Sequence, residues 1–203
     1  MVSFTAFDLI SIFYCVLAIG VIRRLIKNWK DFWDDVITPY DMRLVTEVAF
    51  FLLIPFGVLL HELGHAIAVW HYGGTVLDFE WRVYWGYVSH EGYFTDLERW
   101  WISFSGNLVS ILIGIIPLFF ISRVRKPIIK ELLLYFARLE LIFSLIVYPI
   151  FSFVGFGGDW VRIYNFSVKP YAQITLALHI VLLLVLWKKG IFKSKESNKS
   201  SQF

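Results

Sequence analysis

The stretch FFLLIPFGVLLHELGHAIAVW, residues 50–70, decides how the rest of the sequence is interpreted. It is apolar enough to lie in a lipid bilayer, yet its middle holds the ionisable side chains of His61, Glu62 and His65. Ionisable groups are costly inside a membrane and usually serve a function there. The stretch therefore indicates a membrane-spanning helix that carries a functional polar site.

The composition also indicates an integral, multi-pass membrane protein. Of 203 residues, 58% are hydrophobic, and the mean hydropathy is +0.67. Charged residues make up 17%, below the roughly 25% of a soluble domain. The net charge of +3 is too small to suggest a nucleic-acid partner, so the expected surroundings are the lipid bilayer. The single cysteine, Cys15, excludes an internal disulfide and a cysteine-rich metal site.

Five stretches are long enough to cross a bilayer, which takes about 20 mostly apolar residues. They cover approximately residues 4–26, 44–70, 101–121, 128–154 and 171–187. We expect residues 1–192 to form a single polytopic membrane domain. The polar residues 193–203 are typical of a disordered tail.

A small hairpin is predicted between the second and third stretches. In DFEWRVYWGYV, residues 78–88, apolar and polar side chains alternate, which is typical of a β-strand. SHEGY, residues 89–93, predicts a turn. The expected fold class is therefore all-α transmembrane, with about five spanning helices and a small membrane-associated β-hairpin.

The lysine and arginine residues predict an orientation. Fourteen of them lie in three segments, which follow the first, third and fifth stretches, and four lie in the other two loops. Because positive residues favour the cytoplasmic side, we expect the N-terminus outside and the C-terminus in the cytoplasm. His61 and His65 would then lie toward the outer face.

The HELGH sequence, residues 61–65, has the spacing of a zinc-binding helix. Residues four apart share one helix face, so His61 and His65 can bind one zinc ion. Glu62, beside them, can act as the general base that activates water. The alternative interpretation is a hydrogen-bonded polar cluster between helices, without a metal.

An apolar helix with HELGH and a later GGDW, residues 157–160, resembles the site-2 protease family of intramembrane zinc metalloproteases. The resemblance covers residues 44 to about 160. It implies that His61, His65 and Asp159 hold zinc and that Glu62 activates water. SGNLVS, residues 105–110, resembles a family element that implies a position for Asn107 near the substrate.

Two points depart from the family pattern. Gly158 and Trp160 flank Asp159, where the family usually has an Asn-Pro…Asp-Gly context. The resemblance also places the site nearer the cytoplasm, whereas the charge count places it nearer the outside.

Two other residues are candidates for the third ligand. On a straight helix His71 lies roughly 9 Å beyond His65 along the axis, so it cannot close the site. Glu140 lies well inside the fourth stretch, whereas Asp159 lies just past the end that reaches the depth of the histidines. Asp159 is therefore favoured, and Glu140 is expected either to support the zinc site or to pair with another helix.

The expected function is that of a zinc-dependent endopeptidase that cuts transmembrane or membrane-adjacent peptide. Its partner would be a transmembrane protein or peptide substrate. The alternative is a non-catalytic membrane protein that keeps a structural metal or polar core and binds partner helices. The presence of Glu62 argues against that alternative, and a metal transporter would need more acidic or histidine residues along several spans.

Overall fold

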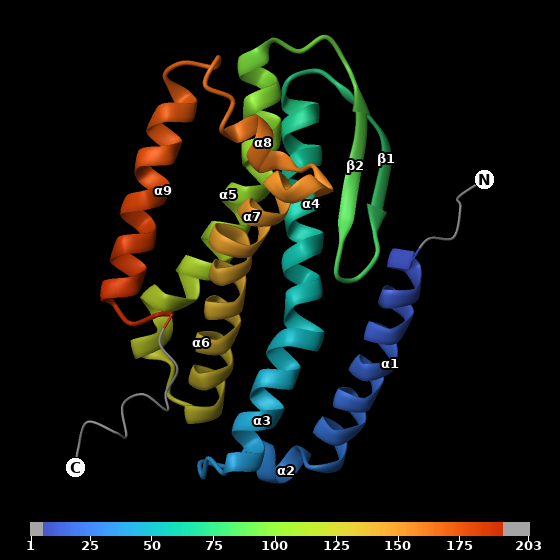
Figure 1. The fold of residues 1–203 in the computed structure, drawn as a ribbon. Helices are drawn as coiled ribbons and strands as arrows, with labels where there is room; N and C mark the ends of the chain where they lie inside the picture. The colour runs from blue at the N-terminus through green and yellow to red at the C-terminus, as the bar shows by residue number, and fades with distance from the viewer. Residues whose placement is uncertain (1–5, 193–203) are drawn as a thin grey trace.

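The computed structural model describes residues 6–192, which form a helical bundle with one small sheet (Figure 1). The α-helices are α1 (Ala6–Lys27), α2 (Trp29–Phe32), α3 (Pro39–Val48), α4 (Ile54–His71), α5 (Asp96–Phe120), α6 (Pro127–Ile142), α7 (Tyr148–Phe151), α8 (Asp159–Ile163) and α9 (Tyr171–Lys188). Three π-helical segments, η1 (Ala49–Leu53), η3 (Phe143–Val147) and η4 (Ser152–Phe156), and one 3-10 helix, η2 (Ile121–Arg123), join them. The strands are β1 (Thr75–Trp81) and β2 (Gly86–Glu91).

Five helical stretches are long and apolar enough to cross a bilayer, as predicted. They are Phe7–Lys27, Pro39–His71, Asp96–Arg123, Pro127–Gly155 and Tyr171–Lys188. The second and third begin about five residues before the predicted stretches, because Thr38 and Thr95 each form a capping box that starts a helix on polar sequence. The tail predicted to be disordered, residues 193–203, lies outside the described residues.

The stretch quoted above lies in the longest of these helices, in which α3, η1 and α4 are continuous over 33 residues. Pro55 has no N–H to donate, and the π-helical turn η1 comes immediately before α4. There the Ile54 N–H bonds to the Ala49 carbonyl, one residue further back than in an α-helix. The helix therefore continues past the proline and carries the polar residues into the middle of the bundle.

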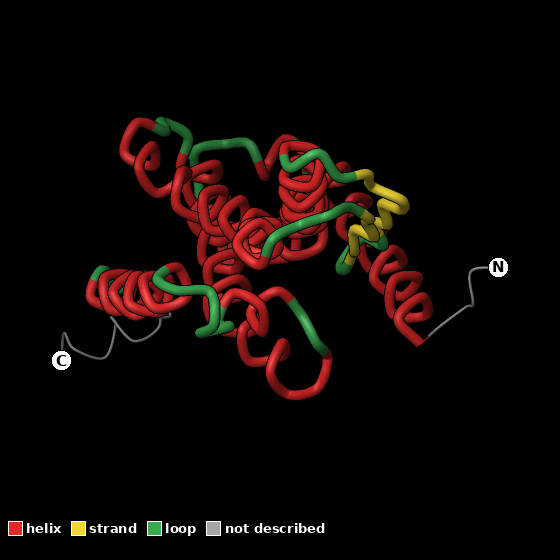
Figure 2. Tube along the Cα trace, turned by 90° about the horizontal axis from the view of Figure 1, so that it is seen from above, coloured by secondary structure: helices red, strands yellow, loops and turns green. Residues whose placement is uncertain are grey.

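Helix α4 runs through the centre of the bundle, between α5 and α6 on one side and α1 and the hairpin on the other (Figures 1 and 2). Gly64 and Gly106 let α4 and α5 approach closely, because a Cβ on Gly64 would lie 3.1 Å from the Gly106 Cα. At the end of the bundle near α2, a buried cluster joins α1, α2, α3 and α6. Its members are Val21, Phe32, Leu44, Val45, Val48 and Ile128.

The hairpin is present, but its predicted turn is misplaced. Strands β1 and β2 pair antiparallel from Thr75 opposite Glu91 to Trp81 opposite Gly86, so the turn covers residues 82–85. The turn predicted at residues 89–93 is wrong, because Ser89 and His90 pair within the sheet. The real turn contains Val83 at a φ of 72°, a conformation that β-branched residues rarely adopt.

Contacts with α1 hold this turn. The Arg82 guanidinium forms an ion pair with Asp8, and the Ser11 hydroxyl donates to the Arg82 carbonyl at 2.9 Å. The Tyr84 hydroxyl donates to the Phe7 carbonyl at 3.2 Å. Local sequence contains no glycine or proline signal at residues 82–85, so a turn fixed by a distant helix was not predictable from it.

Candidate metal centre

Helix α4 places His61 and His65 one turn apart on the face that packs against α5. Their Nε2 atoms lie 3.0 Å from each other. The His65 ring lies directly over Gly106 of α5, where a Cβ would come within 2.6 Å of the ring carbon Cε1. The absence of a side chain at Gly106 therefore gives His65 its place between the two helices.

Asp159 reaches the same point from the segment after η4. Gly155 and Gly157 have φ values of 106° and 62°, which turn the chain back toward the bundle before α8 begins at Asp159. The Trp100 indole N–H donates to the Ile163 carbonyl at 2.9 Å and fixes α8 on α5. The turn and this anchor bring Asp159 beside two residues that precede it by more than 90 positions.

The three side chains form a compact set of ligand atoms. Asp159 Oδ2 lies 3.3 Å from His61 Nε2 and 3.1 Å from His65 Nε2. In a tetrahedral zinc site with bonds of about 2.0–2.1 Å, neighbouring ligand atoms lie about 3.3 Å apart. Among the described residues, this is the only group of three or more His, Cys, Asp or Glu residues that could share a metal ion. The spacing fits one small cation, and the binding of zinc stays a prediction.

The contacts at the two Nδ1 atoms direct both Nε2 atoms toward Asp159 and toward each other. His65 Nδ1 donates to the Ile102 carbonyl at 2.6 Å, so its proton lies on Nδ1. His61 Nδ1 faces the Ser110 hydroxyl at 3.1 Å, and His61 Nε2 faces Asp159 Oδ2 at 3.3 Å. If a metal ion takes the two Nε2 lone pairs, the proton of each neutral ring lies on Nδ1, where His65 donates to Ile102 and His61 to Ser110.

Two neighbours orient the Asp159 carboxylate. The Tyr148 hydroxyl donates to Oδ2 at 2.9 Å, and the Asn107 amide donates to it at 3.2 Å. Burial alone raises the pKa of Asp159, but the charge of His65 when it is protonated, together with hydrogen bonds from His61 and His65, outweighs burial and holds this pKa well below its usual range. The carboxylate is therefore ionised, which is the state that binds a metal.

Asn107 is fully buried, and its amide also donates to the Ser103 carbonyl at 3.1 Å. It does not line any of the three cavities described around the centre. Its predicted contact with substrate stays a prediction, and the structure shows instead a contact with Asp159.

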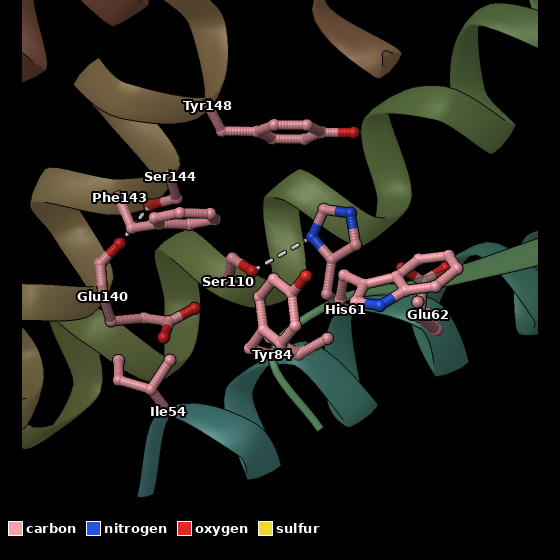
Figure 3. Close-up of a pocket in the computed structure, with 12 residues that line it drawn as sticks. Ile54, His61, Glu62, Tyr84, Ser110, Glu140, Phe143, Ser144 and Tyr148 are labelled. Carbon is pink, nitrogen blue, oxygen red and sulfur yellow. Dashed lines mark hydrogen bonds between the residues drawn. The ribbon is translucent and has the colours of Figure 1, made fainter. Parts of the chain in front are cut away.

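Glu62 lines two cavities, of which Figure 3 shows the first. The first cavity, of about 130 Å³, lies between α4, α6 and the hairpin turn. Glu62, His61 and Tyr148 are among the residues that line it. The second, of about 250 Å³, is lined by Glu62, His65, Asp159 and β2. Within residues 6–192, no hydrogen bond engages the Glu62 carboxylate. The side chain predicted to be the base therefore borders space on both sides of the ligand set.

The other candidates for the third ligand lie away from this set. His71 is an exposed residue at the last position of α4. Glu140 is buried in α6 and lines the 130 Å³ cavity, but it does not belong to the group of converging ligand atoms.

Sequence reasoning missed the roles of Tyr148 and Ser110. Tyr148 contacts both Asp159 and the edge of the His61 ring, and Ser110 contacts His61 Nδ1. A tyrosine inside the fourth apolar stretch was a visible sign, because a buried hydroxyl needs a partner. Ser110 lies four residues from Gly106, a spacing that indicates only a shared helix face.

The chain matches no known family model, no curated protein sequence and no solved structure.

Proposed function

We propose that the protein is a zinc-dependent intramembrane endopeptidase that resembles the site-2 protease family. The observation that carries the proposal is the convergence of His61 Nε2, His65 Nε2 and Asp159 Oδ2 within 3.3 Å of one another. These are nitrogen and oxygen ligands of the kind zinc takes, and three protein ligands leave a fourth position open, as in catalytic zinc sites.

A location in the bilayer is part of the proposal. The five long helices carry exposed apolar side chains, such as Phe13 on α1 at 63% and Leu178 on α9 at 62%. Aliphatic and aromatic side chains exposed along whole helices are expected where the surroundings are lipid. We therefore propose that the protein crosses the membrane several times and that His61, His65 and Asp159 lie within its helical bundle.

The proposed chemistry divides between the metal and Glu62. Zinc held by the three ligands would supply Lewis-acid activation of water and of the peptide carbonyl. The Glu62 carboxylate takes a proton from the attacking water and passes it to the nitrogen of the departing amine. Tyr148 and Asn107 hold the Asp159 carboxylate in place throughout.

The proposed substrate is a transmembrane or membrane-adjacent segment in an extended conformation. A peptide bond inside a helix has its carbonyl shielded by the helical hydrogen bonds, so the segment must unwind before attack. Gly86, Tyr87 and Val88 of β2 line the 250 Å³ cavity beside Glu62, and a Cβ on Gly86 would lie 2.7 Å from Glu62 Cγ. A strand at this position can hold an unwound peptide by strand addition next to the base.

The variant Glu62→Gln tests the proposal. It keeps the shape of the side chain and removes the base, so we expect zinc content close to that of the wild type. Cleavage of a transmembrane peptide in proteoliposomes should fall by roughly 100-fold or more. The matched control is Glu47→Gln, whose side chain pairs with Arg24 in a part of the bundle away from the site and should not affect cleavage.

This experiment also separates the proposal from a non-catalytic membrane protein with a structural metal. If wild type binds zinc but cleaves no peptide, the non-catalytic alternative holds. If Glu62→Gln cleaves as fast as wild type, Glu62 is not the base.

A further inference from the structure

Glu140 is a buried carboxyl group that the proposed chemistry does not use. It lies in α6 within the apolar stretch Pro127–Gly155, and only 4% of its surface is exposed. A carboxyl group at such a position is costly and generally retained for a function. Within residues 6–192 no ion pair engages it, so pairing with a basic residue of another helix does not account for its position.

The neighbouring residues of α4 and α5 leave space for the Glu140 side chain. Gly57 of α4 faces the carboxyl group, and a Cβ at that position would lie 2.5 Å from Glu140 Oε2. On the α5 side the side chain of Ser110 lies beside the carboxyl group, placed to act as a hydrogen-bond donor to it. Glu140 and Ser110 both line the 130 Å³ cavity that His61 and Glu62 also line (Figure 3).

Ser110 connects this carboxyl group to the metal centre. Its hydroxyl lies 3.1 Å from His61 Nδ1 (Figure 3). Because His61 Nε2 belongs to the proposed ligand set, the proton of the neutral ring lies on Nδ1 and the Ser110 oxygen accepts from it. The Ser110 hydroxyl proton is then free to be donated to Glu140. The three groups form one directed chain, from His61 to Ser110 to Glu140.

We propose that Glu140 is a positioning residue, which acts through Ser110 to fix the orientation of the His61 ring and to strengthen its Nε2 as a metal ligand. A histidine ligand that donates its other ring N–H to a hydrogen-bonded acceptor binds metal more tightly, and loss of such a partner typically costs about 10–100-fold in metal affinity. In this chain a serine hydroxyl lies between the carboxylate and the ring. The inference rests on the metal site of the proposed function and does not depend on proteolysis.

The test measures zinc affinity by competition with a chromophoric chelator, on purified full-length protein in detergent. The variants are Ser110→Ala, Glu140→Gln and the double variant. The matched control is Ser144→Ala, because Ser144 is a buried serine that lines the same cavity and bonds only to the Glu140 backbone carbonyl, at 2.7 Å. Thermal unfolding of each apoprotein checks that the variants fold.

We expect each single variant to weaken zinc binding by about 10-fold or more. The double variant should lose no more than the larger single loss, because both changes break one chain. The visible spectrum of the Co²⁺-loaded protein should shift in Ser110→Ala and Glu140→Gln but not in Ser144→Ala, since only the first two change the His61 ligand.

The proposal is overturned if Glu140→Gln keeps the wild-type zinc affinity and cobalt spectrum, or if the two losses multiply in the double variant. A Glu140→Gln variant that fails to fold is replaced by Gly57→Ala, whose added Cβ displaces the carboxyl group and should give the same loss of affinity. Absence of zinc binding in the wild type would instead refute the metal site itself.

Discussion

At the scale of single residues, the proposed metal site depends on the directions in which the lone pairs of His61, His65 and Asp159 point. His65 Nδ1 donates to the Ile102 carbonyl, and His61 Nδ1 lies 3.1 Å from the Ser110 hydroxyl. With both rings neutral, two unprotonated Nε2 atoms 3.0 Å apart and an ionised carboxylate would repel one another. A metal ion at the shared centre would remove this repulsion, and in its absence a proton on His65 would do so by pairing with Asp159 at 3.1 Å.

The identity of the third ligand gives a prediction at this scale. We expect Asp159→Ala to weaken zinc binding by more than about 100-fold, because loss of a residue that merely supports a ligand already costs about 10–100-fold. His71→Ala should keep the wild-type affinity, since His71 is exposed at the end of α4. Equilibrium competition for zinc measures both. Loss of zinc by the His71 variant together with retention by the Asp159 variant would show that the ligand set is misassigned.

At the scale of elements, the close packing of α4 on α5 decides whether the histidines reach Asp159. Gly64 and Gly106 meet at this contact, and Gly106 lies under the His65 ring. Gly155 and Gly157 then return the chain so that α8 delivers the aspartate. Each of these glycines acts through the absence of a side chain or through a positive φ.

The variant Gly106→Ala tests the packing of α4 on α5. Its Cβ would fall within 2.6 Å of His65 Cε1, so the ring must move away from the shared centre. We expect zinc affinity to fall at least about 10-fold, as for other changes that misplace a ligand. In Gly20→Ala, the matched control, the new Cβ meets only Arg24 at an ordinary 3.5 Å, and zinc affinity should be unchanged. An unchanged affinity in Gly106→Ala would mean that the helices are further apart than described.

The sequence predicted most of the helices and the presence of the hairpin. The long apolar runs and the HELGH spacing follow from local composition and helix periodicity, so the five helices and the pairing of His61 with His65 were accessible. Contacts between segments that are distant in the sequence could not be predicted in this way. The turn at residues 82–85 depends on α1, and the Ser110 and Tyr148 contacts depend on how α5 and α6 pack against α4. Asp159 was inferred from a family resemblance and a depth argument, because no local pattern places it beside α4.

At the scale of the whole molecule, the ligand set lies toward one end of the bundle. Figure 1 shows the hairpin and α8 toward one end of the bundle and α2 at the other. In the sequence, the basic residues gather after the first, third and fifth of the long apolar stretches, Phe7–Lys27, Asp96–Arg123 and Tyr171–Lys188. Two orientations in a bilayer remain to be distinguished, one from charge and one from the family resemblance.

The charge distribution predicts that a reporter fused at the C-terminus is cytoplasmic and that a reporter in the 73–99 loop lies on the outer side. Paired alkaline phosphatase and fluorescent protein fusions at each position measure this, because the phosphatase is active only outside and the fluorescent protein mainly inside. The reverse pattern would support the orientation that the resemblance implies, with the site nearer the cytoplasm.

The central claim is that His61, His65 and Asp159 bind a metal ion, and metal analysis tests it most directly. Wild type and His65→Ala are purified side by side in the same detergent, and zinc is measured by mass spectrometry against protein concentration. The account predicts about one zinc per wild-type chain, as one tetrahedral site requires, and a small fraction of that in His65→Ala. Equal zinc in the two proteins would contradict the metal site and with it the proposed function.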